Sequence, residues 1–102
     1  MMTLEGKWNL VIKTPFGEQK LIAELSKASA NYSGTLANEQ GVFPLSAAAF
    51  QGDEAKFEGA VKTPMGELKL SFHGVVTSDN KIFGKCKTMF GESNFSGARA
   101  NA

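Results

Sequence analysis

A six-residue segment that occurs three times constrains the fold of this chain more than any other feature. Its copies span residues 13–18, 62–67 and 87–92, and each ends in Gly-Glu. Each copy lies between runs of alternating apolar and polar residues, the pattern typical of a β-hairpin and its turn. The copies are 49 and 25 positions apart, and a step of 25 from the first reaches residues 37–41, which we interpret as a fourth, diverged turn. The sequence therefore predicts four hairpins of about 25 residues each.

Four hairpins give eight short antiparallel strands in a single domain over residues 1–102. Such a sheet leaves two exposed edges unless it closes on itself, so an all-β, eight-stranded up-and-down barrel is predicted, with a β-sandwich as the alternative. An eight-stranded barrel is either filled by side chains or holds one small ligand. The predicted strands are residues 6–14, 18–26, 31–37, 41–50, 54–63, 67–77, 80–88 and 92–100, and residues 27–30, 51–53 and 78–80 are predicted turns.

The alternation also predicts which side chains face the interior. The fourth strand is apolar on both faces and is not oriented by its pattern. If each repeated turn holds two residues, its Lys lies opposite its Glu on the outer face; a three-residue bulged loop would shift this register by one. The residues predicted to face inward are Trp8, Leu10, Ile12, Leu21, Ala23, Leu25, Tyr32, Gly34, Leu36, Phe57, Gly59, Val61, Leu68, Leu70, Phe72, Gly74, Val76, Ile82, Gly84, Cys86, Phe95, Gly97 and Arg99.

Five strands carry a glycine two positions from a bulky apolar residue on the predicted inner face. Glycine inside a strand costs about 0.5–1 kcal/mol relative to alanine, so five of them require a reason. They either let the strands coil tightly enough to close, with neighbouring aromatic side chains over the gaps, or leave room for a ligand. We favour closure, because a barrel needs such bends and does not need a pocket.

Composition excludes several classes of function. The formal net charge of +1 provides no basic surface for nucleic acid. Cys86 is the single cysteine, so no internal disulfide forms and we expect a reducing compartment. Strand-like sequence begins within a few residues of Met1, and no apolar run is long enough to span a membrane as a helix. We therefore expect a cytoplasmic protein that contacts neither a membrane nor nucleic acid.

Gly6, Trp8 and Arg99 form a pattern that resembles the calycins, the group of lipocalins, fatty-acid-binding proteins and avidins. In that group a Gly-x-Trp opens the barrel, and a basic residue of the last strand packs across the indole. In an eight-stranded meander the start of the first strand and the end of the last are neighbours, so Arg99 could lie over Trp8 and contribute about 0.5–2 kcal/mol. The resemblance implies a small, mostly apolar ligand. The chain departs from lipocalins in its shorter length and in lacking disulfides and a C-terminal helix.

The repeated turns supply the candidate binding residues. Strand parity places Thr14, Asn38, Thr63 and Thr88 inward at one rim, below apolar residues at the turns. One interpretation is a polar ring under an apolar rim that binds an amphipathic molecule. A second is that the threonines cap the turns while the apolar residues fold down and close the barrel; a third is an oligomer contact. The candidate ligand-binding residues are Thr14, Phe16, Asn38, Thr63, Met65, Thr88, Phe90 and Tyr32, with Met89 beside them.

Other reactive side chains give weaker signals. His73 alternates outward and has no second His or Cys/Asp cluster at ligand spacing, so no metal site is expected. Cys86 faces inward without a base, and Tyr32 faces inward near the Trp8 end, where a core tyrosine bonded to backbone is the simpler interpretation. No nucleotide-binding, zinc-protease, nucleophile-elbow or paired-carboxylate motif is present, and no cofactor is expected.

The sequence thus predicts a protein that binds a small apolar or amphipathic molecule at the barrel mouth, and not an enzyme. One alternative is a small lyase or isomerase that uses Tyr32, Cys86 or Arg99 inside the barrel. Another is an oligomeric scaffold in which outer apolar side chains are buried against a partner. The outer residues assigned to that partner contact are Val11, Ile22, Phe43, Leu45 and Phe83.

Overall fold

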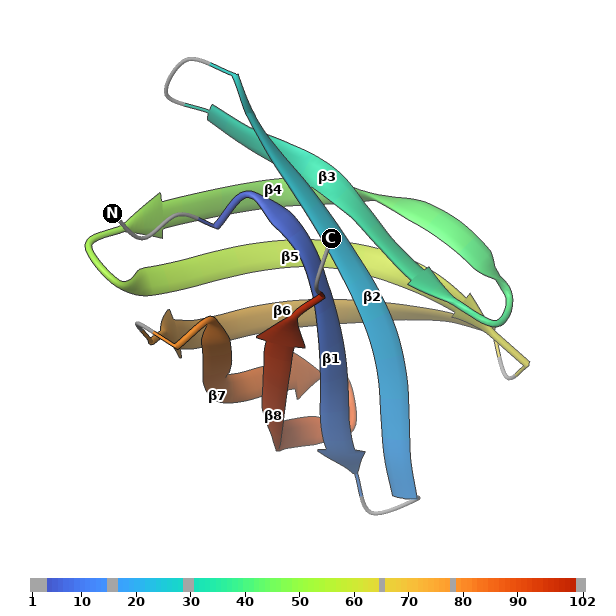
Figure 1. Cartoon of the computed structure of the whole chain (residues 1–102). Helices are drawn as coiled ribbons and strands as arrows, with labels where there is room; N and C mark the ends of the chain where they lie inside the picture. The colour runs from blue at the N-terminus through green and yellow to red at the C-terminus, as the bar shows by residue number, and fades with distance from the viewer. Residues whose placement is uncertain (1–3, 15–16, 29–30, 65, 78, 101–102) are drawn as a thin grey trace.

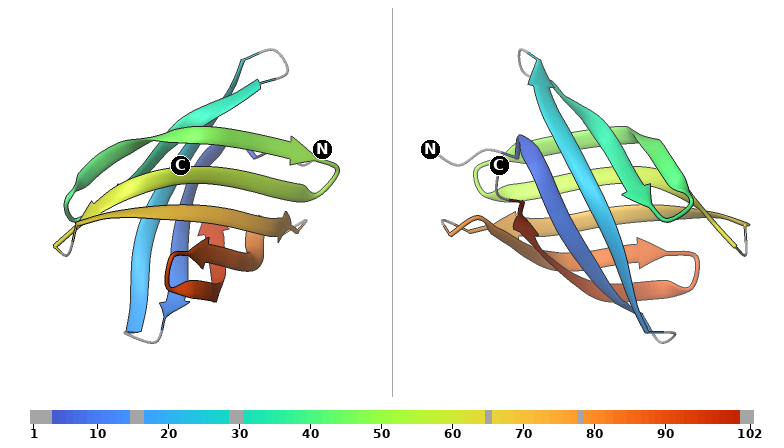
Figure 2. Two further views of the ribbon diagram at one scale, coloured as in Figure 1. Left: turned by 180° about the vertical axis from the view of Figure 1, so that it is seen from behind. Right: turned by 45° about the vertical axis from the view of Figure 1, so that its right-hand side comes forward.

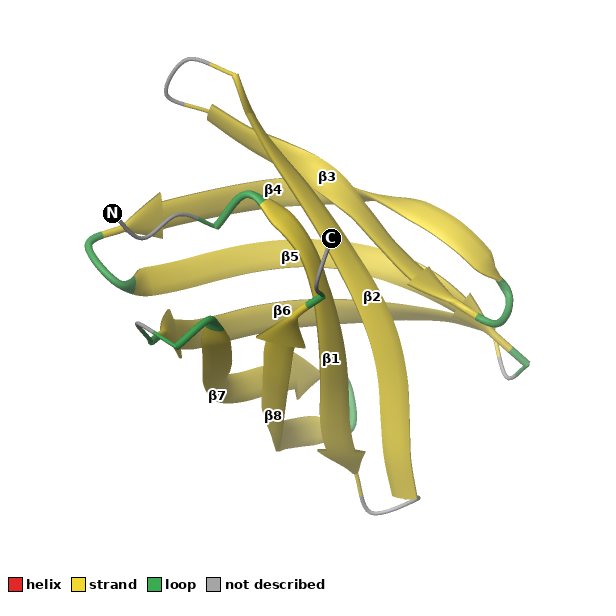
Figure 3. Ribbon diagram, in the orientation of Figure 1, coloured by secondary structure: helices red, strands yellow, loops and turns green. Residues whose placement is uncertain are grey.

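The computed structural model describes residues 4–14, 17–28, 31–64, 66–77 and 79–100. Within these ranges every regular element is a strand, and none is a helix long and apolar enough to cross a membrane (Figure 3). The strands are β1 (Gly6–Thr14), β2 (Gly17–Ala28), β3 (Asn31–Asn38), β4 (Gly41–Gln51), β5 (Glu54–Thr63), β6 (Gly66–Val76), β7 (Lys81–Thr88) and β8 (Gly91–Arg99).

The eight strands form a closed antiparallel barrel in sequence order, as Figure 1 shows. Closure is made by β1 and β8, which pair from Trp8 opposite Arg99 to Lys13 opposite Asn94. The prediction of an up-and-down barrel is therefore confirmed, and the sandwich alternative is wrong. The turns that follow β1, β3, β5 and β7 lie at one end, here called the mouth, and the opposite end is called the base (Figure 2).

The register of the hairpins also agrees with the sequence. Lys13 lies opposite Glu18, Lys62 opposite Glu67 and Lys87 opposite Glu92, so each turn between them holds two residues. The fourth, diverged turn is confirmed as well, because Asn38 lies opposite Gly41 in the same way. One predicted turn differs, since β2 continues to Ala28, two residues beyond its expected end.

The inner face is packed by alternating apolar side chains. The buried residues that form the core are Leu4, Trp8, Leu10, Ile12, Leu21, Ala23, Leu25, Leu36, Ala55, Phe57, Val61, Leu70, Phe72, Val76, Ile82, Cys86 and Phe95. At its centre the rings of Phe57 and Phe72 stack at 4.8 Å, and Phe95 meets Phe72 edge to face at 5.0 Å. Such stacked and edge-to-face contacts are the favoured arrangements of buried aromatic rings.

The structure of β4 explains why its sequence pattern did not show which side chains face the interior. A β-bulge interrupts its pairing with β5 between Leu45 and Ala47, and Ser46 Oγ donates a hydrogen bond of 3.2 Å to Glu58 O. Because a bulge adds one residue, the inward parity changes along the strand. Phe43 and Leu45 pack against the core before the bulge, and Ala48 and Phe50 do so after it. The prediction that Phe43 and Leu45 lie on the outer face is therefore wrong.

The strand glycines are sites of close approach between neighbouring backbones. A Cβ atom built on Gly34 would lie 2.0 Å from Glu24 O, and one on Gly84 would lie 2.1 Å from His73 O. On Gly97 it would meet the Leu10 side chain at 2.6 Å. The space beside these glycines is already occupied, which supports the interpretation that they allow closure and argues against a ligand pocket at the same positions.

Neighbouring strands differ in length at the mouth. The β2–β3 ladder begins at Ile22 opposite Ala37, so residues 17–21 of β2 have no partner in β3. In the same way the β6–β7 ladder begins at Ser71 opposite Lys87, so residues 66–70 of β6 have no partner in β7. The β1–β2 hairpin consequently extends beyond the neighbouring β3–β4 turn, and the β5–β6 hairpin extends beyond the neighbouring β7–β8 turn (Figures 1 and 2).

Candidate functional site

The predicted threonine ring lies at the mouth, and its hydroxyls bond the turns. Thr14 Oγ1 donates to Gly17 O at 2.7 Å, and Thr63 Oγ1 donates to Gly66 O at 2.8 Å. Thr88 Oγ1 makes a longer contact of 3.4 Å to Gly91 O and accepts a hydrogen bond of 3.0 Å from Phe90 N. The first half of the capping interpretation is thus confirmed.

Asn38 occupies the equivalent position in the fourth turn and makes different contacts. Its Oδ1 accepts a hydrogen bond of 2.8 Å from Gln40 N within the turn. Its Nδ2 donates to Lys62 O at 3.0 Å and so links β3 to β5 past the start of β4. The first contact is the one that Thr88 makes with Phe90 N, and the second is made only by the longer asparagine among the described residues at this turn position.

The apolar residues at the turns do not close the barrel where they are described. Phe16 and Met65 lie outside the described residues. Met89 and Phe90, in the turn between β7 and β8, are 80% and 67% exposed. The alternative in which these side chains fold down over the mouth is therefore wrong for this turn.

Tyr32 lies away from the other predicted site residues. It is at the start of β3, at the base of the barrel, whereas the threonines and Asn38 are at the mouth. Its ring meets Phe50 edge to face at 6.3 Å, and Lys27 Nζ lies 5.7 Å from its centroid. The described threonines and Asn38 thus share one end of the barrel, and Tyr32 does not lie with them.

An open groove lies on the outer face of β1, β2 and β3, near the mouth, where β2 continues beyond the end of β3. Its volume is about 530 Å³. Of the predicted site residues that the structure describes, only Asn38 lines it. Sequence reasoning missed the rest because the groove arises from unequal strand lengths; the shorter predicted third strand was the available signal. The lining residues are Asn9, Leu10, Val11, Lys20, Leu21, Ile22, Ala37, Asn38 and Glu39.

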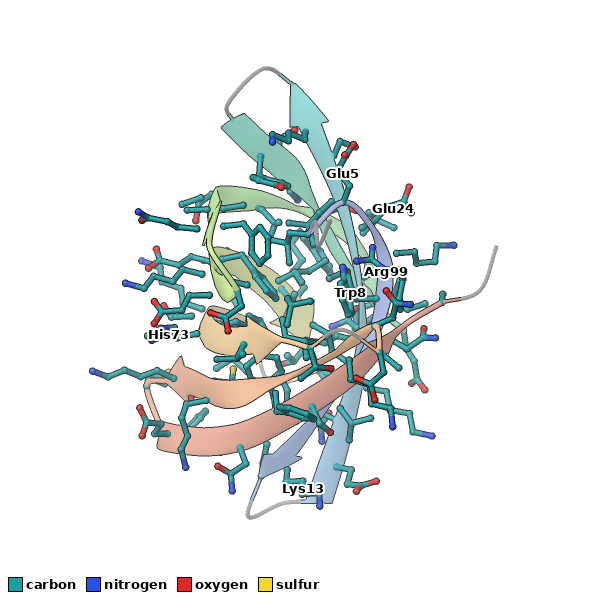
Figure 4. The ribbon with its side chains drawn as sticks, turned by 60° about the vertical axis from the view of Figure 1, so that its left-hand side comes forward. Glu5, Trp8, Lys13, Glu24, His73 and Arg99 are labelled. Atoms are coloured by element: carbon teal, nitrogen blue, oxygen red, sulfur yellow. The ribbon has the colours of Figure 1, made fainter. Side chains whose placement is uncertain are left out.

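The base of the barrel is closed around Trp8. The indole is 1% exposed, its Nε1 donates to Leu4 O at 3.0 Å, and Arg99 Cζ lies 4.2 Å from the ring centroid. Arg99 also donates hydrogen bonds to Glu5 O and to Asn80 Oδ1. Figure 4 shows Trp8 and Arg99 side by side, with Lys13 at the opposite end. The contact expected between Trp8 and Arg99 is therefore present.

Gly6 completes this arrangement. Its φ is +116°, and a Cβ atom there would lie 2.7 Å from Arg99 Nη1. A side chain at position 6 would therefore strain the backbone and displace the guanidinium from the indole. The Gly-x-Trp pattern of the sequence has a direct structural explanation at this end of the barrel.

The other titratable residues that the structure describes form no cluster of three metal-binding side chains. His73 is exposed on the outer face, with Nε2 3.7 Å from Glu54 Oε2. Across the described ranges, no group of three His, Cys, Asp or Glu side chains lies close enough to hold a metal ion. Cys86 is in the core, Tyr32 contacts Phe50, and Arg99 covers Trp8, so these three side chains do not converge on one reacting position.

Cys86 is expected to be unreactive in the folded protein. The thiol is fully buried, and burial raises the pKa of Cys86 to about 12. The reactive thiolate is then about a thousandfold rarer at pH 8 than for an ordinary thiol. We expect modification by a disulfide reagent to be slowed by at least that factor, and to become fast in guanidinium. A native rate equal to the denatured rate would contradict the burial of this side chain.

The same pKa difference predicts a loss of stability at high pH. Since the folded state holds the proton more tightly, the stabilisation is complete below the unfolded pKa near 9 and is lost as pH rises toward 12. Above pH 9 the free energy of unfolding should fall more steeply than in Cys86→Ala, by up to about 1.4 kcal/mol per pH unit. Parallel pH profiles for the two proteins would contradict this expectation.

Comparison with known proteins supports the fold alone. No protein-family model matches the chain, and no curated protein matches it. Among solved structures it is similar to a redesigned β-barrel, with a TM-score of 0.69 and 10% sequence identity, over 97% of this chain and 92% of that one. At this identity the likeness defines a small closed β-barrel and carries no information about a ligand.

Proposed function

We propose that this barrel is a calycin-like binding protein that takes one small amphipathic molecule in the outer groove beside its mouth. The observation that carries the proposal is the groove between β2 and the end of β3, whose volume of about 530 Å³ falls within the range of small-molecule sites. The calycin-like part rests on the contact between Trp8 and Arg99 and on the closed eight-stranded topology.

The lining of the groove has the chemistry of a site for an amphipathic ligand. Val11 and Ala37 are partly exposed on the outer face and Ile22 is 40% exposed, so the groove provides apolar contact surface. Lys20 and Glu39 add one cation and one anion, and Asn9 and Asn38 add two amides. An apolar surface with a few polar groups is typical of pockets that bind and orient small organic molecules. An apolar chain with an anionic or hydrogen-bonding head group fits this arrangement best.

The packed interior directs the ligand to the groove and away from the barrel axis. Phe57, Phe72 and Phe95 contact one another at the centre of the core. The strand glycines are covered by neighbouring backbone and side chains. The proposed site therefore differs from one inside a barrel, and its position follows from the unequal lengths of β2 and β3.

The proposal is tested by titrating the protein with dodecanoate, below the concentration at which it forms micelles, in a calorimeter. Ala37→Trp places a large side chain in the groove and should weaken binding at least about tenfold. Ala49→Trp is the matched control, because Ala49 is exposed on β4 and does not line the groove. Absence of binding by the unaltered protein, or equal weakening by both variants, would refute the proposed site.

A further inference from the structure

Strand β6 has a free edge at the mouth. Residues 66–70 extend beyond the ladder with β7, which begins at Ser71 opposite Lys87. Thr63 and Gly66 flank a two-residue turn and form a hydrogen-bonded pair of the β5–β6 ladder. Because hydrogen-bonded pairs alternate along an antiparallel ladder, the even-numbered residues of β6 direct their N–H and C=O groups toward β5. The N–H and C=O groups of Glu67 and Lys69 consequently point to the side where β7 is absent.

This segment is complementary to a second copy of itself. If two copies pair antiparallel about a twofold axis at Leu68, Glu67 of each lies opposite Lys69 of the other, and Gly66 lies opposite Leu70. The two charged side chains share the outer face, where both are exposed, and the structure gives neither of these two described residues an ion pair within the chain. Opposite charges directly across a strand pair stabilise that register.

Apolar surface adjoins the same edge. The β7–β8 turn comes directly after Lys87 and Thr88, at the point where the free segment of β6 begins. Met89 and Phe90 in this turn are 80% and 67% exposed. A strand added to β6 would continue the line of β7, so its end would abut this turn and cover part of its apolar surface. Leu68, which is partly buried against the core, would meet its counterpart at the twofold axis.

We propose that the protein forms a symmetric dimer in which residues 66–70 of two copies pair as antiparallel strands. Strand addition at an exposed sheet edge is an established mode of recognition, and a twofold contact closes without growing into a fibre. Residues 17–21 of β2 repeat the same Gly-Glu-x-Lys-Leu pattern. In a dimer formed at that edge, however, Gln19 would lie at the twofold axis in place of Leu68, and the neighbouring turn contains the polar Glu39 and Gln40. The β6 edge is thus the more apolar of the two.

Sedimentation equilibrium of the full chain between about 10 µM and about 1 mM tests the proposal. The unaltered protein should show a monomer–dimer equilibrium in this range. Lys69→Glu places like charges opposite each other in the dimer and should weaken it at least about tenfold. Combining Glu67→Lys with Lys69→Glu reverses the charges, restores complementarity, and should recover the original dissociation constant within about threefold.

Lys20→Glu makes the equivalent change on the β2 edge and should leave the equilibrium unchanged. Circular dichroism confirms that each variant is folded before it is compared. A purely monomeric mass at the highest concentration would overturn the proposal, as would a Lys69→Glu protein that dimerises normally. Loss of the dimer in Lys20→Glu instead, or a charge-reversed variant that does not recover, would also overturn it. All of these outcomes are read from the molecular mass without ligand, and dodecanoate binding is measured separately on Ala37→Trp and Ala49→Trp, so failure of this inference and failure of the proposed function are distinguishable.

Discussion

Gly84→Val is expected to prevent the barrel from closing. Gly84 lies opposite Gly74 in the β6–β7 ladder, and a Cβ atom at position 84 would lie 2.1 Å from His73 O and 2.6 Å from Gly74 Cα. Both are backbone atoms, so relief requires β6 and β7 to move apart. Overpacking of a dense core commonly costs 1–3 kcal/mol, and we expect about 3 kcal/mol or more here because a branched side chain meets main chain. Guanidinium denaturation followed by circular dichroism measures the loss.

Gly52→Ala is the control for glycine replacement in general. Gly52 lies in the turn between β4 and β5 with a φ of +66°, and a Cβ atom there would meet nothing within 4 Å. Its cost should be that of a left-handed backbone alone, about 1–2 kcal/mol. A Gly84→Val protein as stable as Gly52→Ala would show that β6 and β7 do not approach as closely as described.

Trp8→Ala is expected to have the second large effect, a loss of about 3–5 kcal/mol of stability. The indole is almost fully buried, bonds Leu4 O, and lies under Arg99. Removing it leaves a cavity at the base and takes away the ring that the guanidinium covers. Thermal and chemical unfolding should both report the change, and a loss below about 1 kcal/mol would be inconsistent with Trp8 as a principal core residue.

Arg99→Met distinguishes the contribution of the charged guanidinium from that of the aliphatic side-chain stem in the contact with Trp8. Methionine keeps apolar cover over the indole but loses the charge and the hydrogen bonds to Glu5 O and Asn80 Oδ1. A double-mutant cycle with Trp8→Phe should give a coupling energy of about 0.5–2 kcal/mol. A coupling near zero would show that Arg99 acts through its hydrogen bonds alone.

Most of the fold was predictable because the turns and the alternation agree. Lys13 opposite Glu18 fixes the register of the β1–β2 hairpin. The same Lys–Glu pairing recurs in the β5–β6 and β7–β8 hairpins. The failure at β4 has a local cause. Pro44 and the three alanines that follow Ser46 do not make one face of the strand more polar than the other. The bulge beside Ser46 then reverses which alternate residues face the interior. Without a change in polarity, alternation contains no information about orientation.

The candidate site was less predictable than the fold. The threonines were placed correctly at the mouth, but their hydroxyls bond the turns, as Thr14 and Thr63 show. The groove depends on β2 continuing beyond β3, a relation between two strands that no single segment records. Tyr32 was included among the candidate ligand-binding residues although its strand parity already placed it near Trp8, and the structure puts it at the base, at the start of β3.

The most direct test of the account is a crystal structure of the protein with dodecanoate bound. We predict one molecule in the groove, with its chain against Val11 and Ile22, its head group near Lys20 or Asn38, and the interior filled by Phe57 and Phe72. A molecule lying inside the barrel between these two rings, or at the base beside Trp8, would contradict the account.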